Sequence, residues 1–298
     1  MPTPIKVRDL IPMLALALLA GPAWAADEPA TTVKTDNDLV YTKVGETELK
    51  LDLARPAEGD GPFPGVVVIH GGAWRGGSKD SNRRILSEFA KHGYVAISPQ
   101  YRFCPKDVFP AQVIDVKASV RWLRSHKDEY KLDADHIGAT GFSAGGHLSL
   151  MLGLTGPDDG LEGETTAGAP SSRVQAVVNY FGPTDLAATD FEDVSRNLIK
   201  DFLGGAPADK PEAAAKASPL TFVSKDDPPV LTFQGTKDPL VPYTQAIKLG
   251  EAMTKVGVPG RVELLVGASH GWGGDEIKRT FEDTFSFFDA HLKPAKKP

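Results

Sequence analysis

Short apolar segments alternate with segments of helical periodicity along most of this chain, and this alternation limits the fold more than any other feature. Apolar runs bounded by turn residues predict strands, at Gly65–Ile69, Tyr94–Ser98, His136–Thr140, Val174–Tyr180, Pro229–Phe233 and Val262–Val266. Segments with the period of a helix lie at Ser81–His92, Ala111–His126, Ala144–Leu154, Phe191–Phe202, Tyr243–Val256 and Ile277–Leu292. Apolar strands that alternate with helices are typical of a mostly parallel sheet covered on both faces. The sequence therefore predicts one doubly wound α/β domain.

An antiparallel hairpin is predicted at the start of this domain. Leu39–Val44 and Thr47–Ala54 have the pattern of two strands that meet at a turn around Gly45. We expect this hairpin at the edge of the sheet. The polar residues before it, 26–37, predict a flexible stretch.

The domain is predicted to span residues 38–293, followed by a short basic tail at 294–298. Two long segments, 155–172 and 184–219, interrupt the alternation of strands and helices. Segments of this length are often functional, so we treat both as candidate caps or lids.

The N-terminus has the pattern of a targeting segment. Two basic residues precede an apolar run, Leu10–Ala20, and Ala23 and Ala25 then occupy the small-residue positions of a cleavage site. We predict a signal peptide, residues 1–25, and a secreted or periplasmic protein with no stable membrane anchor. The alternative is a retained anchor, but the run is shorter than the roughly 20 residues of a spanning helix and contains Pro12 next to its start.

The composition argues against several classes of protein. With 298 residues, 41% hydrophobic and 24% charged, the chain suits a globular domain with one full core. Its formal net charge of −6 argues against nucleic acid as the main partner. Cys104 is the one cysteine, so no disulfide can form within the chain, and we expect this thiol to be buried. Asp158 and Asp159 have no further ligand at a suitable spacing, so no metal site is predicted.

A serine lies between glycines where a predicted strand runs into a predicted helix. Gly141, Phe142, Ser143, Ala144 and Gly145 match the pattern G-x-S-x-G, in which a sharp turn exposes the serine hydroxyl. A short pattern of this kind also recurs by chance, so its meaning depends on the residues after the other strands. In parallel sheets, ligands bind beyond the carboxyl ends of the strands.

Three other predicted strand ends carry residues suited to acyl transfer. These strands lead into His70-Gly71-Gly72-Ala73-Trp74, Gly235-Thr236-Lys237-Asp238 and Ala268-Ser269-His270-Gly271. A serine hydroxyl is a weak nucleophile at neutral pH and needs a base, which is usually a neutral imidazole. We assign His270 as the base for Ser143. Asp238 is assigned as the carboxylate that orients the imidazole and stabilises its charged form.

Other assignments of the acid and the base are weaker. Asp226 and Asp227 lie near Asp238 in sequence, but they precede their strand and so belong at its opposite end. His70 belongs to a glycine-rich loop, and His147 lies inside a predicted helix. The remaining histidines lie near the ends of elements, where solvated roles are common; they are His92, His126, His136 and His291.

Backbone N–H groups are predicted to stabilise the reaction intermediate. The tetrahedral intermediate of acyl transfer carries a negative oxygen, and each preorganised donor to it is worth roughly 3 kcal/mol of barrier. Ala144 follows the nucleophile and would donate from the N-terminus of its helix, where the helix dipole favours an anion. Gly72 and Ala73 would donate from the loop after the first core strand. We predict an oxyanion hole from these three residues.

These residues resemble a known family over roughly residues 65–292. With HGGAW at 70–74 and GFSAGGHL at 141–148, the chain resembles the serine carboxylesterases of the α/β-hydrolase fold. It is most similar to the branch that contains hormone-sensitive-lipase-type esterases and the bacterial feruloyl and acetylxylan esterases. The order of serine, aspartate and histidine is also that of this fold. The resemblance implies the same triad and oxyanion loop, although many lipase-type relatives have a third glycine where this chain has Ala73. The mechanism requires no cofactor, so none is predicted.

Aromatic residues next to these motifs are candidates for the wall of an acyl or aromatic pocket. They are Trp74, Phe142, Tyr180, Phe181 and Trp272. Packing in the core explains each of them equally well.

Three functions are compatible with these residues. The first is a secreted serine ester hydrolase that acts through an acyl-enzyme on short-chain acyl esters or, as the resemblance implies, on acetyl or feruloyl esters of plant cell walls. The second is a peptidase or amidase of the same fold, including an arylformamidase-like enzyme. The third is a non-catalytic binding protein, which would be expected to have lost a triad residue. The first is our prediction, with a small or polysaccharide-linked ester as substrate.

Overall fold

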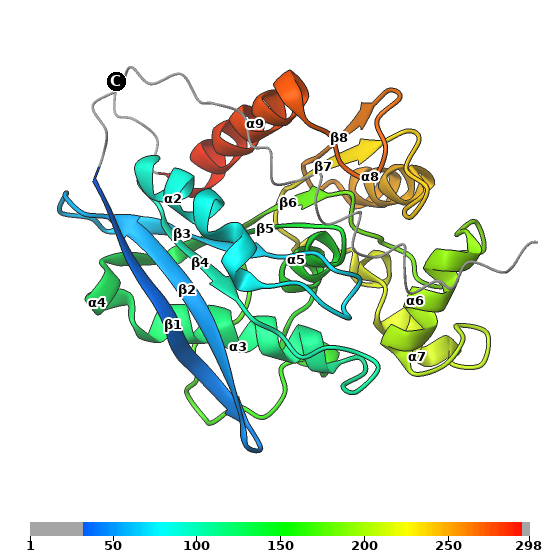
Figure 1. Cartoon of the computed structure of the whole chain (residues 1–298), viewed down its shortest axis with the longest axis horizontal. Helices are drawn as coiled ribbons and strands as arrows, with labels where there is room; N and C mark the ends of the chain where they lie inside the picture. The colour runs from blue at the N-terminus through cyan, green and yellow to red at the C-terminus, as the bar shows by residue number, and fades with distance from the viewer. Residues whose placement is uncertain (1–31, 294–298) are drawn as a thin grey trace, which may run out of the picture.

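The structure is a computed structural model that describes residues 32–293. In this part of the chain the strands form one eight-stranded sheet, in the order β1-β2-β4-β3-β5-β6-β7-β8 (Figure 1). The strands are β1 (Val33–Val44), β2 (Thr47–Pro56), β3 (Phe63–Ile69), β4 (Val95–Pro99), β5 (Leu132–Phe142), β6 (Ala176–Tyr180), β7 (Val230–Gly235) and β8 (Gly260–Leu265). β2 is antiparallel to both of its neighbours, and all other pairs are parallel. This confirms the predicted α/β class with an antiparallel hairpin at the edge of the sheet.

Helices cover both faces of the sheet (Figure 1). They are η2 (Lys79–Asn82), α2 (Arg83–Lys91), α3 (Ala111–Ser125), α4 (Lys127–Tyr130), α5 (Ala144–Leu154), η3 (Pro157–Asp159), α6 (Asp193–Leu203), α7 (Pro211–Lys216), η4 (Pro219–Phe222), α8 (Thr244–Val256) and α9 (Gly274–Leu292). Successive side chains of a strand point to opposite faces. Val66 and Val68 accordingly pack in one buried cluster with Phe89 of α2 and Phe288 of α9. Val67 packs in a second cluster with α3, α5 and α8.

Parallel pairing brings the carboxyl ends of the central strands to one edge of the sheet. Ile69 of β3 pairs with Gly141 of β5, and Phe142 pairs with Tyr180 of β6. Tyr180 pairs in turn with Phe233 of β7. Gly235 at the end of β7 pairs with Leu265 at the end of β8. The segments that follow these five strands therefore begin side by side, and they include the residues predicted to form the site.

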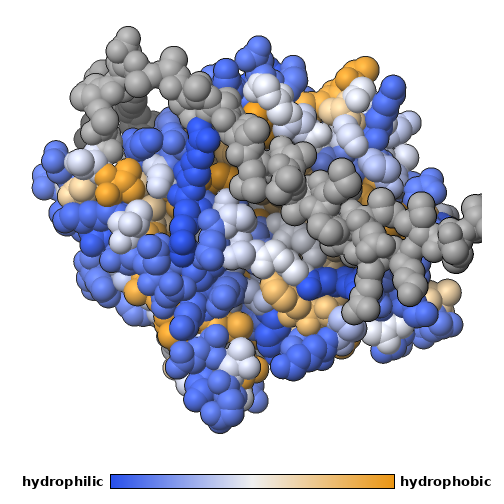
Figure 2. All heavy atoms as spheres, viewed as in Figure 1, coloured by the Kyte–Doolittle hydropathy of each residue, from blue (hydrophilic) through white to orange (hydrophobic). Residues whose placement is uncertain are grey.

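The first strand begins earlier than the sequence predicts. β1 starts at Val33, opposite Pro56 of β2, so residues 33–37 belong to the sheet and not to the flexible stretch predicted at 26–37. Only one residue of this edge strand, Tyr41, is buried, and the surface around the strand is largely hydrophilic in Figure 2. A strand that buries few side chains lacks the apolar pattern by which strands are recognised. The remainder of the flexible stretch, the predicted signal peptide and the predicted basic tail lie outside the described residues.

The two candidate lid segments lie at different ends of the sheet. α5 begins beside Ser143 and runs back along the sheet, so residues 155–172 emerge at the opposite end. There the buried ammonium of Lys117 in α3 binds Glu162 at 2.7 Å. This segment does not cover the serine, contrary to what its length suggested. Residues 184–219, which follow the carboxyl end of β6, fold into α6, α7 and the start of η4.

Two further observations concern the class of protein. Among the residues that the structure describes, the helices are all too short or too polar to span a membrane. Cys104 is buried as expected, and burial raises the pKa of its thiol to about 11. The thiol is therefore protonated at neutral pH and is a poor nucleophile.

Candidate active site

Ser143 lies at the sharp turn between β5 and α5. Its backbone has φ 55° and ψ −119°, a conformation that costs a residue with a side chain roughly 1–3 kcal/mol. Two glycines allow this turn: a Cβ on Gly145 would lie 2.1 Å from the carbonyl oxygen of Ile69, and a Cβ on Gly141 would lie 2.5 Å from that of Gly145. The Ser143 N–H donates to the carbonyl oxygen of Tyr180 at 2.9 Å. Close packing of α5 against β3 therefore maintains the strained position of the serine.

His270 connects Ser143 to Asp238. Its Nε2 lies 2.9 Å from Oγ of Ser143, and its Nδ1 lies 2.7 Å from Oδ2 of Asp238. The Asp238 side chain is 0% exposed and the His270 side chain 9% exposed. An ionised carboxylate can only accept, so Nδ1 carries the imidazole proton and Nε2 is free to accept from the serine hydroxyl. The structure brings the three side chains assigned from the sequence into one hydrogen-bonded chain.

Three donors in addition to His270 hold the Asp238 carboxylate. The N–H groups of Leu240 and Val241 donate to its Oδ1 at 2.8 and 2.9 Å, and Nε2 of Gln234 donates to its Oδ2 at 3.1 Å. A buried carboxylate needs such donors, because they replace the water it has lost. Asp227, one of the alternative acids, instead accepts hydrogen bonds from a serine before β7.

Two backbone segments meet beside the nucleophile. The loop after β3 passes close to Ser143: a Cβ on Gly71 would lie 3.5 Å from the Cβ of the serine. The next residues, Gly72 and Ala73, turn with φ of 122° and 53°. Ala144 is the first residue of α5, so its N–H has no carbonyl partner within the helix and lies at the positive end of the helix dipole. The loop that carries Gly72 and Ala73 thus begins beside the serine, and Ala144 directly follows the serine.

Two other histidines near the site are buried, and their imidazoles bond to groups other than the Ser143 hydroxyl. His70 stacks on Tyr101 with 4.4 Å between ring centroids, and its Nδ1 donates to the carbonyl oxygen of Gly71 at 2.8 Å. Burial lowers the pKa of His70 to about 4. His147 is enclosed in α5, and burial lowers its pKa to about 4 as well. Both imidazoles are therefore neutral at pH 7.

Comparison with known proteins identifies the family. Residues 51–253 match the BD-FAE family. The chain belongs to this family. The match confirms the predicted group, the carboxylesterases of the α/β-hydrolase fold.

Curated relatives of this BD-FAE member include esterases of mycobacteria. The chain is 35% identical over 224 residues to the probable carboxylic ester hydrolase LipM of Mycobacterium tuberculosis (strain ATCC 25618 / H37Rv), a match that covers 71% of this chain and 50% of LipM. The chain spans about half the length of the curated relatives it matches first.

Solved esterase structures have the same fold as this BD-FAE member. A truncated form of a carbohydrate esterase from gut microbiota is 28% identical, with a TM-score of 0.77, and the match covers 92% of this chain and 100% of that one. Esterase 2 of Thermogutta terrifontis with propionate bound is 28% identical, with a TM-score of 0.72 and coverage of 90% and 97%. The same esterase phosphorylated by paraoxon is 27% identical, with a TM-score of 0.71 and coverage of 90% and 97%.

The five candidate pocket aromatics of this BD-FAE member lie in different environments. Phe181 sets its ring edge against His270, with 4.7 Å between centroids, and against partly exposed Trp272 at 5.2 Å. Phe142 packs on Tyr180 at 4.8 Å. Tyr180 is fully buried, and its hydroxyl bonds to a threonine of α9. Trp74 is buried against α6. Tyr180 and Trp74 are therefore core residues, whereas Phe181 directly contacts the candidate base.

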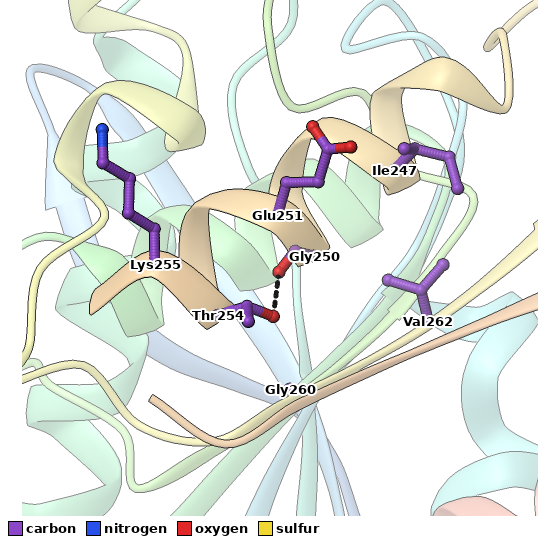
Figure 3. A pocket seen from close by; sticks show the side chains of 7 residues that line it. All are labelled: Ile247, Gly250, Glu251, Thr254, Lys255, Gly260 and Val262. Carbon is purple, nitrogen blue, oxygen red and sulfur yellow. Dashed lines mark hydrogen bonds between the residues drawn. The ribbon is translucent and has the colours of Figure 1, made fainter. Parts of the chain in front are cut away.

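A hollow of about 530 Å³ lies between α8 and β8, away from the predicted site (Figure 3). It is lined by Ile247, Gly250, Glu251, Thr254, Lys255, Gly260 and Val262. None of these residues belongs to the predicted site, and β8 is the last strand of the sheet. Within residues 32–293, no three His, Cys, Asp or Glu side chains come together as a metal site requires.

Some residues that support the site were missed from the sequence. Gln234, the last residue but one of β7, is fully buried, and its amide donates both to Asp238 and to the carbonyl oxygen of Val241 at 3.0 Å. A polar residue inside the apolar strand that precedes Asp238 is a signal from which this supporting role could have been predicted. The role of Phe181 also depends on its φ of 44°, which no sequence pattern predicts.

Proposed function

We propose that this protein is a serine carboxylic ester hydrolase that acts through an acyl-enzyme. The observation that carries the proposal is the hydrogen-bonded chain from Ser143 through His270 to Asp238, beside a glycine-rich loop and a helix N-terminus. A nucleophile, a base and oriented N–H donors are the groups that acyl transfer requires. The family and the esterases among its relatives and structural neighbours support the same reaction.

In the first half of the reaction, Oγ of Ser143 attacks the ester carbonyl carbon while Nε2 of His270 takes the hydroxyl proton. The carbonyl π electrons move to the oxygen, and the N–H groups of Gly72, Ala73 and Ala144 stabilise this oxyanion. Asp238 stabilises the imidazolium. When the tetrahedral intermediate collapses, the bond to the leaving oxygen breaks, and this oxygen receives the proton from Nε2 and departs as the alcohol.

In the second half, water repeats the same steps on the acyl-enzyme. Nε2 of His270 takes a proton from water as the water oxygen attacks the acyl carbon. The resulting intermediate expels Oγ of Ser143, which takes the proton back from Nε2. The carboxylic acid leaves and the free enzyme is restored, so no further group is consumed.

The substrate class we propose is a short-chain acyl ester or an acetyl or feruloyl ester of a polysaccharide. One structural neighbour is described as a carbohydrate esterase, and Thermogutta terrifontis esterase 2 has been solved with propionate and with butyrate bound.

The decisive experiment is an activity panel with Ser143→Ala as the blank. It includes p-nitrophenyl esters of increasing acyl length, methyl ferulate, acetylated xylan and a p-nitroanilide. Ester turnover that is absent from the blank supports the proposal and ranks acetyl against feruloyl groups. Cleavage of the anilide alone would favour a peptidase or amidase, and inactivity on every substrate would favour a binding protein. Equal turnover by Ser143→Ala would contradict the assigned nucleophile.

We also propose export of the protein, with cleavage after Ala25. The basis is the order of basic residues, the apolar run and the small residues in the first 25 positions. N-terminal sequencing of the protein recovered outside the cytoplasm tests this proposal. A mature protein that starts at Ala26, or within one residue of it, agrees with the proposal. A protein that still starts at Met1 contradicts it.

A further inference from the structure

The oxyanion loop contains two consecutive residues in a left-handed conformation. Ala73 and Trp74 have φ of 53° and 57°, which costs a residue with a Cβ roughly 1–2 kcal/mol each. The carbonyl oxygen of Gly72 accepts the N–H of Arg75 at 3.0 Å and thereby closes a tight turn. These dihedral angles set the directions of the N–H groups that the proposed function uses. Contacts from elsewhere must therefore offset the strain.

Trp74 makes the contacts that anchor this loop. Trp74 is 4% exposed, and its indole stacks on Phe202 of α6, with 4.3 Å between ring centroids and 16° between the planes. The indole Nε1–H donates to Nδ1 of His147 at 3.2 Å. The carbonyl oxygen of Trp74 accepts the N–H of Cys104 at 2.9 Å. The side chain and the backbone of one residue thus both hold the strained turn.

His147 is restricted to one form by its two partners. Its Nε2 lies 2.8 Å from the carbonyl oxygen of Ala217, which can only accept, so the proton is on Nε2. Nδ1 then has a free lone pair and accepts the indole N–H of Trp74. Full burial favours the neutral imidazole. One neutral tautomer therefore satisfies both hydrogen bonds.

The contacts of both Trp74 and His147 include residues of the segment 184–219. Phe202 and Ala217 belong to this segment, and Arg75, the residue after Trp74, pairs with Asp201 of α6 at 3.1 Å. We propose that Trp74 is a positioning residue whose hydrogen bond to His147 and stacking on Phe202 hold the oxyanion loop in its active conformation. The segment 184–219 thereby determines the oxyanion geometry, in addition to lying beside the site. This inference rests on the proposed function.

Four variants distinguish an effect of the Trp74–His147 hydrogen bond on activity from a general loss of stability. Trp74→Phe removes the indole donor and keeps an aromatic ring. His147→Gln places an amide near the position of Nε2, so it keeps the bond to Ala217 and loses the acceptor for Trp74. His147→Asn places its amide oxygen near the position of Nδ1 and keeps that acceptor. Tyr94→Phe is the matched control, because it deletes a buried aromatic donor that bonds to Asp289 of α9 at 2.6 Å.

The measurements are kcat and KM of each variant on p-nitrophenyl acetate, at a temperature well below its melting temperature. The concentration of active sites is taken from the burst of p-nitrophenol in the first turnover. Trp74→Phe and His147→Gln are expected to lose tenfold or more in kcat, since a displacement of about 1 Å costs up to roughly 10²-fold, with KM changed less than twofold. Phosphorylation of the serine by paraoxon should slow in parallel, because its phosphoryl oxygen occupies the same donors. His147→Asn and Tyr94→Phe should keep kcat within threefold of wild type.

Two results would overturn the inference, and they are distinguishable. If wild type turns over the ester and His147→Gln matches His147→Asn in kcat, the hydrogen bond to Trp74 does not position the loop, and the proposed function stands. If wild type is no faster than Ser143→Ala, the proposed function fails and the inference fails with it. A Trp74→Phe chain that does not fold leaves the two histidine variants to decide. The pH of half-maximal activity should be the same in all active variants, because His270 and Asp238 are untouched.

Discussion

Phe181 sets the edge of its ring against the imidazole of His270, with 4.7 Å between the ring centroids and 62° between their planes. Phe181 is 2% exposed, and its N–H donates to the carbonyl oxygen of Phe233 at 2.8 Å. Asp238 holds one nitrogen of the imidazole, and the phenyl ring restricts the tilt of the imidazole plane. The orientation of the base thus depends on the residue that directly follows β6, which is outside the triad.

Phe181→Leu should weaken this support while keeping the site apolar. An aromatic pair contributes about 0.5–1.5 kcal/mol beyond the area it buries, and a less restricted base spends less time in the reactive orientation. We expect kcat on a short-chain ester to fall roughly tenfold, with little change in KM. Phe89→Leu, in α2, is the control for lost packing and should lower stability alone. Equal kcat values for the two variants would show that Phe181 only fills space.

Two replacements of Ser143 should distinguish the backbone strain at this position from the role of the serine hydroxyl in turnover. The φ of 55° and ψ of −119° suit glycine and disfavour alanine. Ser143→Gly and Ser143→Ala should therefore both lose turnover, but Ser143→Gly should be more stable than Ser143→Ala by about 1 kcal/mol, or roughly 2–4 °C in Tm. Calorimetry on the two variants measures this difference. A more stable alanine variant would argue against strain at the serine.

Asp238→Asn should lose roughly 10⁴-fold in kcat while the protein folds normally. The amide oxygen can still accept the N–H groups of Leu240 and Val241, but its NH₂ group facing Nδ1 favours the wrong imidazole tautomer. Asp227→Asn is the matched control, because that carboxylate lies before β7 and should not affect turnover. The activity panel described above measures both variants. Full activity of Asp238→Asn would mean that another carboxylate orients His270.

The sequence predicted the sheet, the covering helices and the main catalytic candidates because each has a local signal. Apolar runs mark the central strands, and G-x-S-x-G depends on close approaches at Gly141 and Gly145 that permit no side chain. Ser143, Asp238 and His270 follow β5, β7 and β8, and they converge because these parallel strands end at one edge of the sheet.

Features that depend on tertiary contacts were missed or misplaced. The exposed edge strand from Val33 carries no apolar alternation, and the length of 155–172 does not reveal that α5 delivers it to the far end of the sheet. Trp74 was a candidate for the pocket wall, but its indole bonds to His147, a residue 73 positions away in sequence. No local pattern encodes such a contact.

Acidification should destabilise the protein through its two buried histidines near the site. The folded pKa of His147 is about 4, because burial disfavours the imidazolium, and an unfolded histidine titrates near 6.5. Above pH 6.5 neither state binds the proton. Between pH 6.5 and 4 the unfolded chain binds a proton that the folded chain does not. The free energy of unfolding therefore decreases as the pH is lowered, by about 3 kcal/mol across this window. His70 has the same lowered pKa and should contribute a similar loss.

Urea denaturation at pH 7 and at pH 4.5 tests this for His147. The wild type loses stability from both histidines over this interval, whereas His147→Asn has no imidazole at 147 to protonate. The loss between the two pH values should therefore be smaller in His147→Asn than in wild type by about 2–3 kcal/mol. The comparison cancels the carboxylates, which titrate alike in both proteins. An equal loss in the two proteins would mean that His147 is protonated in the folded state, and that state could not accept the indole N–H of Trp74.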